Sequence, residues 1–177
     1  MRVFVLCTGR CGSTTLARAC GHLINYTSGH ETRANRIGDD RFDYPDQHVE
    51  VDNRLSWFLG DLERRFGDDP LYVHLRRDPE AVATSFTHRW DRGIIGAFDA
   101  GIVFGSKPPD RAMDMCRFYV DTVTANIEAF LRGKPRQMTV WLEDAPSWLP
   151  NLWTSIGGEG DRQAAIDEFS VHHIATT

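Results

Sequence analysis

A turn near the start of the chain carries residue types that bind anions. The segment Gly9-Arg10-Cys11-Gly12-Ser13-Thr14-Thr15 follows an apolar run and precedes a stretch with helical spacing of its apolar residues. Backbone N–H groups at a helix start point toward one spot and carry partial positive charge, which favours a bound phosphate or sulfate. Arg10 adds a cation, and Gly12 would let the backbone approach an anion closely. Ser13 and Thr14 add hydroxyl donors, whereas an ordinary turn with a capping serine is the alternative.

This turn differs from the Walker loop of nucleoside triphosphatases. That loop has the pattern Gly-x-x-x-x-Gly-Lys-Ser/Thr, in which the lysine reaches the β- and γ-phosphates. Ser13 stands at the position of the lysine, and Cys7 stands at the position of the first glycine. The sequence therefore disfavours a magnesium-bound nucleoside triphosphate, and a kinase or nucleotide hydrolase with a degenerate loop is kept as an alternative function.

A second segment with phosphate-binding residue types follows a later apolar run. It reads Arg76-Arg77-Asp78-Pro79-Glu80-Ala81-Val82-Ala83-Thr84-Ser85. The guanidinium group of Arg77 can bind a phosphate through two parallel N–H bonds. Ser85 lies two turns into a helix that is expected to begin at Pro79. Ligands of open α/β sheets bind beyond the carboxyl ends of the strands, so this segment is expected at the same sheet edge as the first turn.

Both segments resemble motifs of the sulfotransferases that use 3′-phosphoadenosine 5′-phosphosulfate (PAPS). The first is similar to their 5′-phosphosulfate loop, with Cys11 in place of the usual serine, and the second is similar to their 3′-phosphate motif. The late segment Trp141-Leu142-Glu143-Asp144 resembles a strand end of the same family, whereas a late Arg-Lys-Gly phosphate loop is missing. The resemblance implies that PAPS is the cofactor and that no metal is needed. The implied cofactor contacts are Gly9, Arg10, Cys11, Gly12, Ser13 and Thr14 at the 5′-phosphosulfate, and Arg77 and Ser85 at the 3′-phosphate.

The segment Gly29-His30-Glu31-Thr32-Arg33 resembles the Glu-Thr-Arg segment of the tyrosylprotein sulfotransferases, whose glutamate is the general base. The resemblance implies that Glu31 removes the acceptor's proton and that Arg33 orients Glu31 or the acceptor. Glu31 is also the first carboxylate after residues 1–30, which contain none, so it would face a cationic site. His30 is the competing base, and a solvated His-Glu pair in a loop is the alternative to a catalytic role.

The segment Asp52-Asn53-Arg54 resembles the Asn-Lys pair of the tyrosylprotein sulfotransferases. The resemblance implies that Arg54 stabilises the sulfuryl group, with Arg10 as the second catalytic cation. In cytosolic sulfotransferases a catalytic histidine occupies about this location, so Asp52 is a further candidate for the base or for a substrate contact. The alternative is that Asp52 or Asn53 merely caps a helix.

Strand and helix patterns alternate along the chain and would position these segments. Apolar runs predict strands over 2–7, 48–52, 71–75 and 137–142, and helical spacing predicts helices over 13–24, 55–66, 79–90, 110–131 and 147–156. The alternation predicts an α/β fold, namely a three-layer, doubly wound and mostly parallel sheet. The resemblance adds that it is of the P-loop nucleotide-binding type. Residues 25–47 and 91–109 are expected to be irregular, the latter as a substrate-covering loop or a plain exposed connection.

Composition limits the class of protein. The 177 residues suit one domain, and the net charge of −5 argues against a nucleic-acid binder. Four cysteines without a paired spacing predict free thiols, and the absence of a signal peptide and of a long apolar run predicts a cytoplasmic protein outside the membrane. We therefore expect a sulfotransferase domain over 1–177 that acts on a small-molecule, glycan or peptide acceptor. A nucleotide-binding module of the same fold without catalysis is the remaining alternative.

Overall fold

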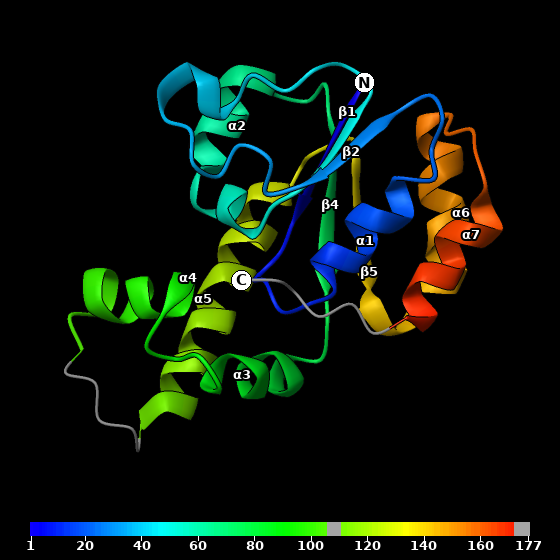
Figure 1. Cartoon of the computed structure of the whole chain (residues 1–177). Helices are drawn as coiled ribbons and strands as arrows, with labels where there is room; N and C mark the ends of the chain where they lie inside the picture. Colours follow the sequence, from blue (N-terminus) through cyan, green and yellow to red (C-terminus); the bar gives the residue numbers. More distant parts are fainter. Residues whose placement is uncertain (106–110, 172–177) are drawn as a thin grey trace.

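A five-stranded parallel sheet forms the centre of the chain. The computed structural model describes residues 1–105 and 111–171, and its strands follow the order β2-β3-β1-β4-β5 (Figure 1). The strands are β1 (Arg2–Leu6), β2 (Thr27–His30), β3 (His48–Val51), β4 (Leu71–Arg76) and β5 (Gln137–Trp141). Every pairing is parallel, and Val5 of β1 is in register with Val51 of β3 and Val73 of β4. The predicted α/β fold with a parallel sheet is confirmed.

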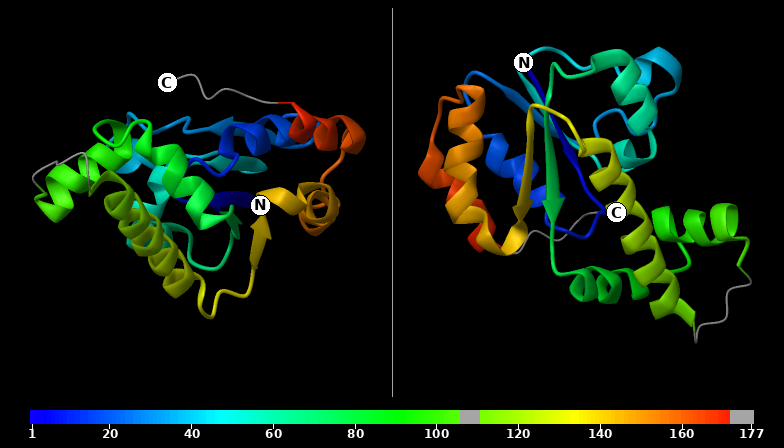
Figure 2. Two further views of the ribbon diagram at one scale, coloured as in Figure 1. Left: turned by 90° about the horizontal axis from the view of Figure 1, so that it is seen from below. Right: turned by 180° about the vertical axis from the view of Figure 1, so that it is seen from behind.

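Helices cover both faces of the sheet (Figure 2). Successive residues of a strand point to opposite faces, so Val3 and Val5 of β1 join one buried cluster, while Phe4 and Leu6 join the other. The first cluster includes residues of α1 (Ser13–Cys20), α6 (Ala145–Ile156) and α7 (Arg162–Asp167). The second includes residues of α2 (Leu59–Phe66), α3 (Pro79–Thr87) and α5 (Ala112–Leu131). The result is the expected three-layer arrangement.

Regular structure occurs in both stretches that were expected to be irregular. Residues 27–30 form β2, an edge strand with no buried residue, so the expectation for 25–47 was wrong there, and Gly38–Arg41 forms a 3-10 helix, η1. Residues 93–103 form α4 (Gly93–Ala97) and a π-helix, η3 (Phe98–Val103). Residues 106–109 of that expected loop lie outside the described residues.

Several helices end earlier than their apolar patterns predicted. Helix α1 ends at Cys20, where the Gly21 N–H bonds to the carbonyl groups of the last turn, and Ile24 is 79% exposed. Helix α3 likewise ends at Thr87 rather than at Trp90. The helix expected over 55–66 is split into a 3-10 helix, η2 (Asn53–Trp57), and α2. The expected start of α5 at Asp110 is outside the described residues.

The sequence patterns missed α7 and the 3-10 helix that follows it, η6 (Glu168–Ser170). None of the helices within residues 1–105 and 111–171 has the length and apolar character that spanning a membrane requires.

Candidate functional site

The turn between β1 and α1 presents a row of free backbone donors. Gly9, Arg10 and Gly12 adopt left-handed conformations with φ of 82°, 58° and 82°. The first hydrogen bond of α1 runs from the Leu16 N–H to the Gly12 carbonyl at 2.9 Å, and the N–H groups of residues 10–15 have no acceptor among the described residues. Gly12 precedes the helix without any side-chain cap, so the alternative of a capping serine is wrong. These N–H groups are available to an anion.

Gly12 also has a packing role. A Cβ atom at this position would lie 2.4 Å from Cδ1 of Leu142, so the missing side chain makes room for Leu142. Leu142 opens the short 3-10 helix η5 (Leu142–Asp144) just after β5. A Cβ atom at Gly9 would lie 2.8 Å from Nδ2 of Asn53. The turn is therefore packed tightly against the ends of β3 and β5.

The second predicted segment lies beside this turn, because β4 pairs directly with β1. Nε of Arg10 donates to the Ser85 hydroxyl at 2.9 Å, and Nη1 of Arg77 donates to the Arg10 carbonyl at 3.0 Å. Asp78 caps α3 by accepting from the Ala81 N–H at 2.7 Å, which fixes the helix that carries Ser85. The structure thus brings together the residues that the two motifs proposed for phosphate binding.

The charge at this place is positive and uncompensated. Burial, together with the positive charges of Arg89 and Arg77, lowers the pKa of Arg10. Within residues 1–105 and 111–171, none of these three arginines forms an ion pair with a carboxylate. Arg89 was not among the predicted residues. It lies beyond the end of α3 at Thr87, so helical spacing from Ser85 does not place it, and the sequence signal is only a further arginine shortly after the segment 77–85.

Glu31 and Arg54 contact each other. Glu31 directly follows β2, and its carboxylate forms an ion pair with Nη1 of Arg54, which lies in η2 beyond β3. The two side chains are 28% and 38% exposed, so a molecule in solution can reach both. His30 Nε2 is hydrogen-bonded to the Ser13 hydroxyl at 3.0 Å. The end of β2, with the candidate base, therefore lies beside the turn between β1 and α1.

Asp52 has a structural role. Its side chain is fully buried, its Oδ1 accepts from the Arg54 N–H at 2.7 Å, and its Oδ2 pairs with the buried Arg41 at 2.5 Å. Burial raises the pKa of Asp52, while the charge of Arg41 opposes the rise. The capping alternative is therefore confirmed, and a carboxylate without exposed surface cannot touch an acceptor.

Arg33 and Cys11 also differ from their expected roles. Arg33 is directed away from Glu31, because it donates to the Asp40 carbonyl at 3.1 Å and lies 3.4 Å from the Asp43 carboxylate. The Cys11 side chain is fully buried, and its hydrogen bond to Cys7, together with burial, raises the pKa of Cys7. Only the backbone of Cys11 is therefore available to an anion.

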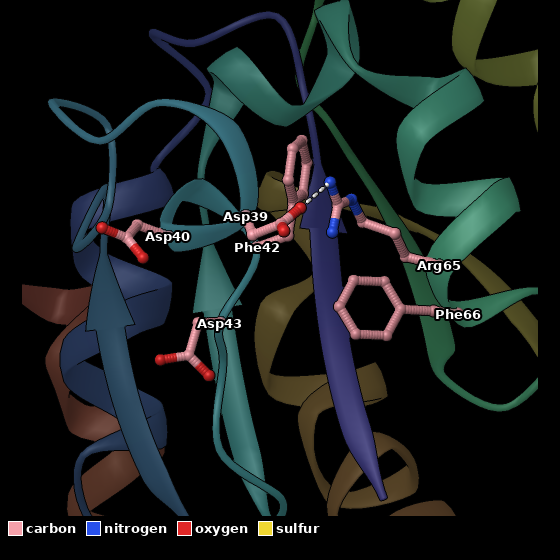
Figure 3. A pocket seen from close by; sticks show the side chains of 6 residues that line it. All are labelled: Asp39, Asp40, Phe42, Asp43, Arg65 and Phe66. Atoms are coloured by element: carbon pink, nitrogen blue, oxygen red, sulfur yellow. Dashed lines mark hydrogen bonds and ion pairs between the residues drawn. The ribbon is translucent and has the colours of Figure 1, made fainter.

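A separate pocket of about 440 Å³ lies between the segment around η1 and the end of α2 (Figure 3). It is lined by Asp39, Asp40, Phe42, Asp43, Arg65 and Phe66. Arg65 is paired with Asp39 at 2.6 Å, so the lining carries more negative than positive charge. This pocket includes none of the predicted site residues and is unsuited to a phosphate.

Comparisons with known proteins support the fold. No protein-family model matches the chain, and no curated protein matches its sequence. Among solved structures, a sulfotransferase domain from the curacin biosynthetic pathway matches with a TM-score of 0.61 and 16% identity. The match covers 98% of this chain and 75% of that one. The chain therefore has a fold like that of a sulfotransferase domain.

Proposed function

We propose that the chain is a sulfotransferase that uses PAPS as its donor and moves the sulfuryl group to a hydroxyl or amine of an acceptor. The observation that carries the proposal is the cluster of Arg10, Arg77 and Arg89 beside a turn with free backbone N–H groups. Glu31, an accessible carboxylate, lies at the same sheet edge. The likeness to a sulfotransferase domain supports this assignment at the level of the fold.

The residues fit a donor with two phosphate-bearing ends. The backbone N–H groups of residues 10–15 and the hydroxyls of Ser13 and Thr14 suit the 5′-phosphosulfate. Arg77, Ser85 and Arg89 suit the 3′-phosphate, since a guanidinium group can bind two phosphate oxygens at once. When bound, PAPS supplies the sulfuryl group together with a phosphate leaving group. The excess of arginine over carboxylate at this place matches the negative charge of such a molecule.

The remaining residues have separate tasks in transfer. Glu31 accepts the proton of the acceptor's hydroxyl or amine, which requires an exposed carboxylate at the mouth of the site. Arg54 holds that carboxylate by its ion pair, and Arg54 and Arg10 would stabilise the negative charge that develops on the leaving phosphate. His30 keeps the Ser13 hydroxyl in place through their hydrogen bond.

The experiment follows radiolabelled sulfate from PAPS into pools of phenols, sugars, amines and tyrosine-containing peptides. We expect the wild-type chain to label at least one pool. Glu31→Gln should lower that rate about 100-fold, because general base catalysis typically contributes two to four orders of magnitude. The matched control is Glu159→Gln, which removes an exposed carboxylate outside the site and should leave the rate unchanged.

Two results would redirect the proposal. Full turnover of Glu31→Gln with intact nucleotide binding would remove Glu31 from the role of base. Binding of 3′,5′-ADP by a wild-type chain that labels no acceptor would indicate the non-catalytic module instead.

A further inference from the structure

A second glutamate, Glu50 of β3, lies beneath the turn that carries Glu31. Its side chain is fully buried, and its Oε1 accepts from the Thr32 N–H at 2.7 Å. Its Oε2 accepts from the Thr32 hydroxyl, also at 2.7 Å. Burying a carboxylate costs free energy of folding unless the carboxylate is hydrogen-bonded. Here both oxygens of Glu50 accept hydrogen bonds from Thr32, the residue that follows Glu31. Glu50 therefore holds Thr32, and with it the turn that follows β2.

The backbone at Glu31 needs such support. Its φ is 53°, in the left-handed region that residues with a side chain rarely adopt. A conformation of this kind persists only where the surrounding structure holds it. The Glu31 N–H donates to the Val51 carbonyl at 3.2 Å on one side, and Glu50 holds Thr32 on the other. Glu31 is therefore fixed to β3 from both sides.

Glu50 is itself held in place by its neighbours on β2 and β3. Nε2 of His48 donates to its Oε2 at 2.9 Å, and Nδ1 of His48 is hydrogen-bonded to the Thr27 hydroxyl at 2.8 Å. A Cβ atom at Gly29 would lie 2.1 Å from Cγ2 of Thr32 and 3.2 Å from Oε2 of Glu50. The absence of a side chain at Gly29 leaves the space in which Thr32 and Glu50 meet.

We infer that Glu50 is a positioning residue, which acts through Thr32 to aim the carboxylate of Glu31 at the site. The inference rests on the proposed function of Glu31. Glu50 has no exposed surface, so it takes no part in binding the donor or the acceptor. A glutamate that served only the stability of β3 would not need to use both oxygens on the residue after the base.

The test compares Glu50→Gln, Thr32→Val and Thr32→Ser. Glu50→Gln replaces one accepting oxygen by an amide donor, Thr32→Val removes the hydroxyl, and Thr32→Ser keeps both donors of Thr32 as the conservative control. We expect the first two changes to accelerate hydrogen exchange of the residue-32 amide about tenfold or more. The same two should lower kcat about tenfold, with the KM for PAPS and the affinity for 3′,5′-ADP within about twofold of wild type. Thr32→Ser should keep the wild-type values.

A double variant shows whether Glu50 acts through Glu31. In a Glu31→Gln background, adding Glu50→Gln should cost no further activity, because the group being aimed is already gone. A further tenfold loss would overturn the inference, and so would wild-type exchange and kcat in Glu50→Gln. Equal losses in Thr32→Ser and Thr32→Val would overturn it as well.

The positioning role of Glu50 and the catalytic role of Glu31 are tested separately. If Glu50→Gln does not fold, the Thr32→Val and Thr32→Ser pair still decides between the outcomes. The exchange measurement needs no turnover, so a wild-type chain that transfers nothing would overturn the proposed function alone. The amide of residue 32 would then still show whether Glu50 holds the turn.

Discussion

Six arginines of the chain fall into two groups that differ in their partners. The arginines of the first group each contact an aspartate: Arg33 with Asp43, Arg41 with Asp52, and Arg65 with Asp39. Those of the second group are close together and, among the described residues, have no carboxylate partner: Arg10, Arg77 and Arg89. Arg41 and Arg65 connect the segment between β2 and β3 to the end of β3 and to α2, whereas Arg33 forms its pair within that segment. The second group leaves positive charge for a ligand.

The difference suggests that the clustering of arginines without carboxylate partners, rather than the number of arginines, distinguishes the proposed site. The chain has 20 basic residues, 25 acidic residues and a net charge of −5, which suggests no anion site at all. The arginines of the first group neutralise nearby aspartates, whereas Arg10, Arg77 and Arg89 concentrate positive charge at one edge of the sheet. Removing a paired arginine should therefore affect stability, and removing an unpaired one should affect binding.

The largest effect is a loss of stability on breaking the buried ion pair of Arg41 and Asp52. Arg41→Met leaves the fully buried Asp52 carboxylate without its partner, which should lower the free energy of unfolding by about 3–5 kcal/mol. Chemical denaturation measures this loss. Arg65→Met is the matched control, because its partner Asp39 is 90% exposed and such pairs contribute about 0–1 kcal/mol. Equal stability of the two variants would contradict the distinction between buried and exposed pairs.

His74, a buried histidine whose Nδ1 atom lacks a hydrogen-bond partner among the described residues, gives the second effect. Burial, and to a lesser extent the charge of Arg76, lowers the pKa of His74 to about 4, and its Nδ1 has no hydrogen-bond partner. The unfolded chain takes up this proton near the ordinary pKa of 6.5, before the folded chain does. Stability that is complete above pH 6.5 should therefore fall by about 3 kcal/mol as the pH drops toward 4.

Melting temperatures across this pH range test the prediction. His74→Asn should show a flatter profile between pH 6.5 and 4 than the wild-type chain. Identical slopes would show that His74 is already protonated in the folded state, or that its burial does not control the acid response.

The third effect tests the shape of the turn between β1 and α1, which is the proposed site of the 5′-phosphosulfate. Gly12→Ala should cost about 1–2 kcal/mol of stability, because alanine is strained at a φ of 82°. It should also weaken binding of 3′,5′-ADP, since the new Cβ atom displaces Leu142 and the turn with it. Gly60→Ala in α2 is the control, because a Cβ atom there meets nothing within 4 Å. Unchanged binding by Gly12→Ala would mean that the turn does not hold the nucleotide.

The smallest effect is expected at Arg89, a cation that the sequence motifs did not include. Arg89→Met should weaken 3′,5′-ADP binding about three- to tenfold without loss of stability, because it removes one positive charge beside Arg10. Arg92→Met, an exposed arginine of the next turn, should bind as the wild type does. If the two variants bind equally well, Arg89 lies outside the binding site.

The sequence predicted the features that depend on local patterns. Buried strands appear as apolar runs, and the glycine turn and the Asp-Pro helix start have characteristic residues, so Arg10, Arg77 and Ser85 were placed at one sheet edge. Strand β2 was missed because Thr27-Ser28-Gly29-His30 contains no apolar residue. It is held by its pairing with β3, which is a contact between distant parts of the chain.

The roles of individual charged residues were harder to predict for the same reason. Asp52 is buried and forms its ion pair with Arg41, which comes from a separate segment of the chain. The capping role of Asp52 could therefore not be decided from Asp52-Asn53-Arg54 alone. Arg33 is turned toward Asp43 by the left-handed backbone at Glu31 and the chain that follows. No spacing rule predicts such a turn at a glutamate.

Calorimetric titration of 3′,5′-ADP in the presence of EDTA tests the central claim most directly. The wild-type chain should bind this nucleotide without magnesium. Arg77→Met should bind it at least about tenfold more weakly at unchanged stability, because a hydrogen bond to a charged group contributes about 1.5–3 kcal/mol. Arg33→Met, from the paired group, should bind it as the wild type does. No binding at millimolar 3′,5′-ADP, or binding of ATP only with magnesium, would contradict the claim that the unpaired arginines form a PAPS site.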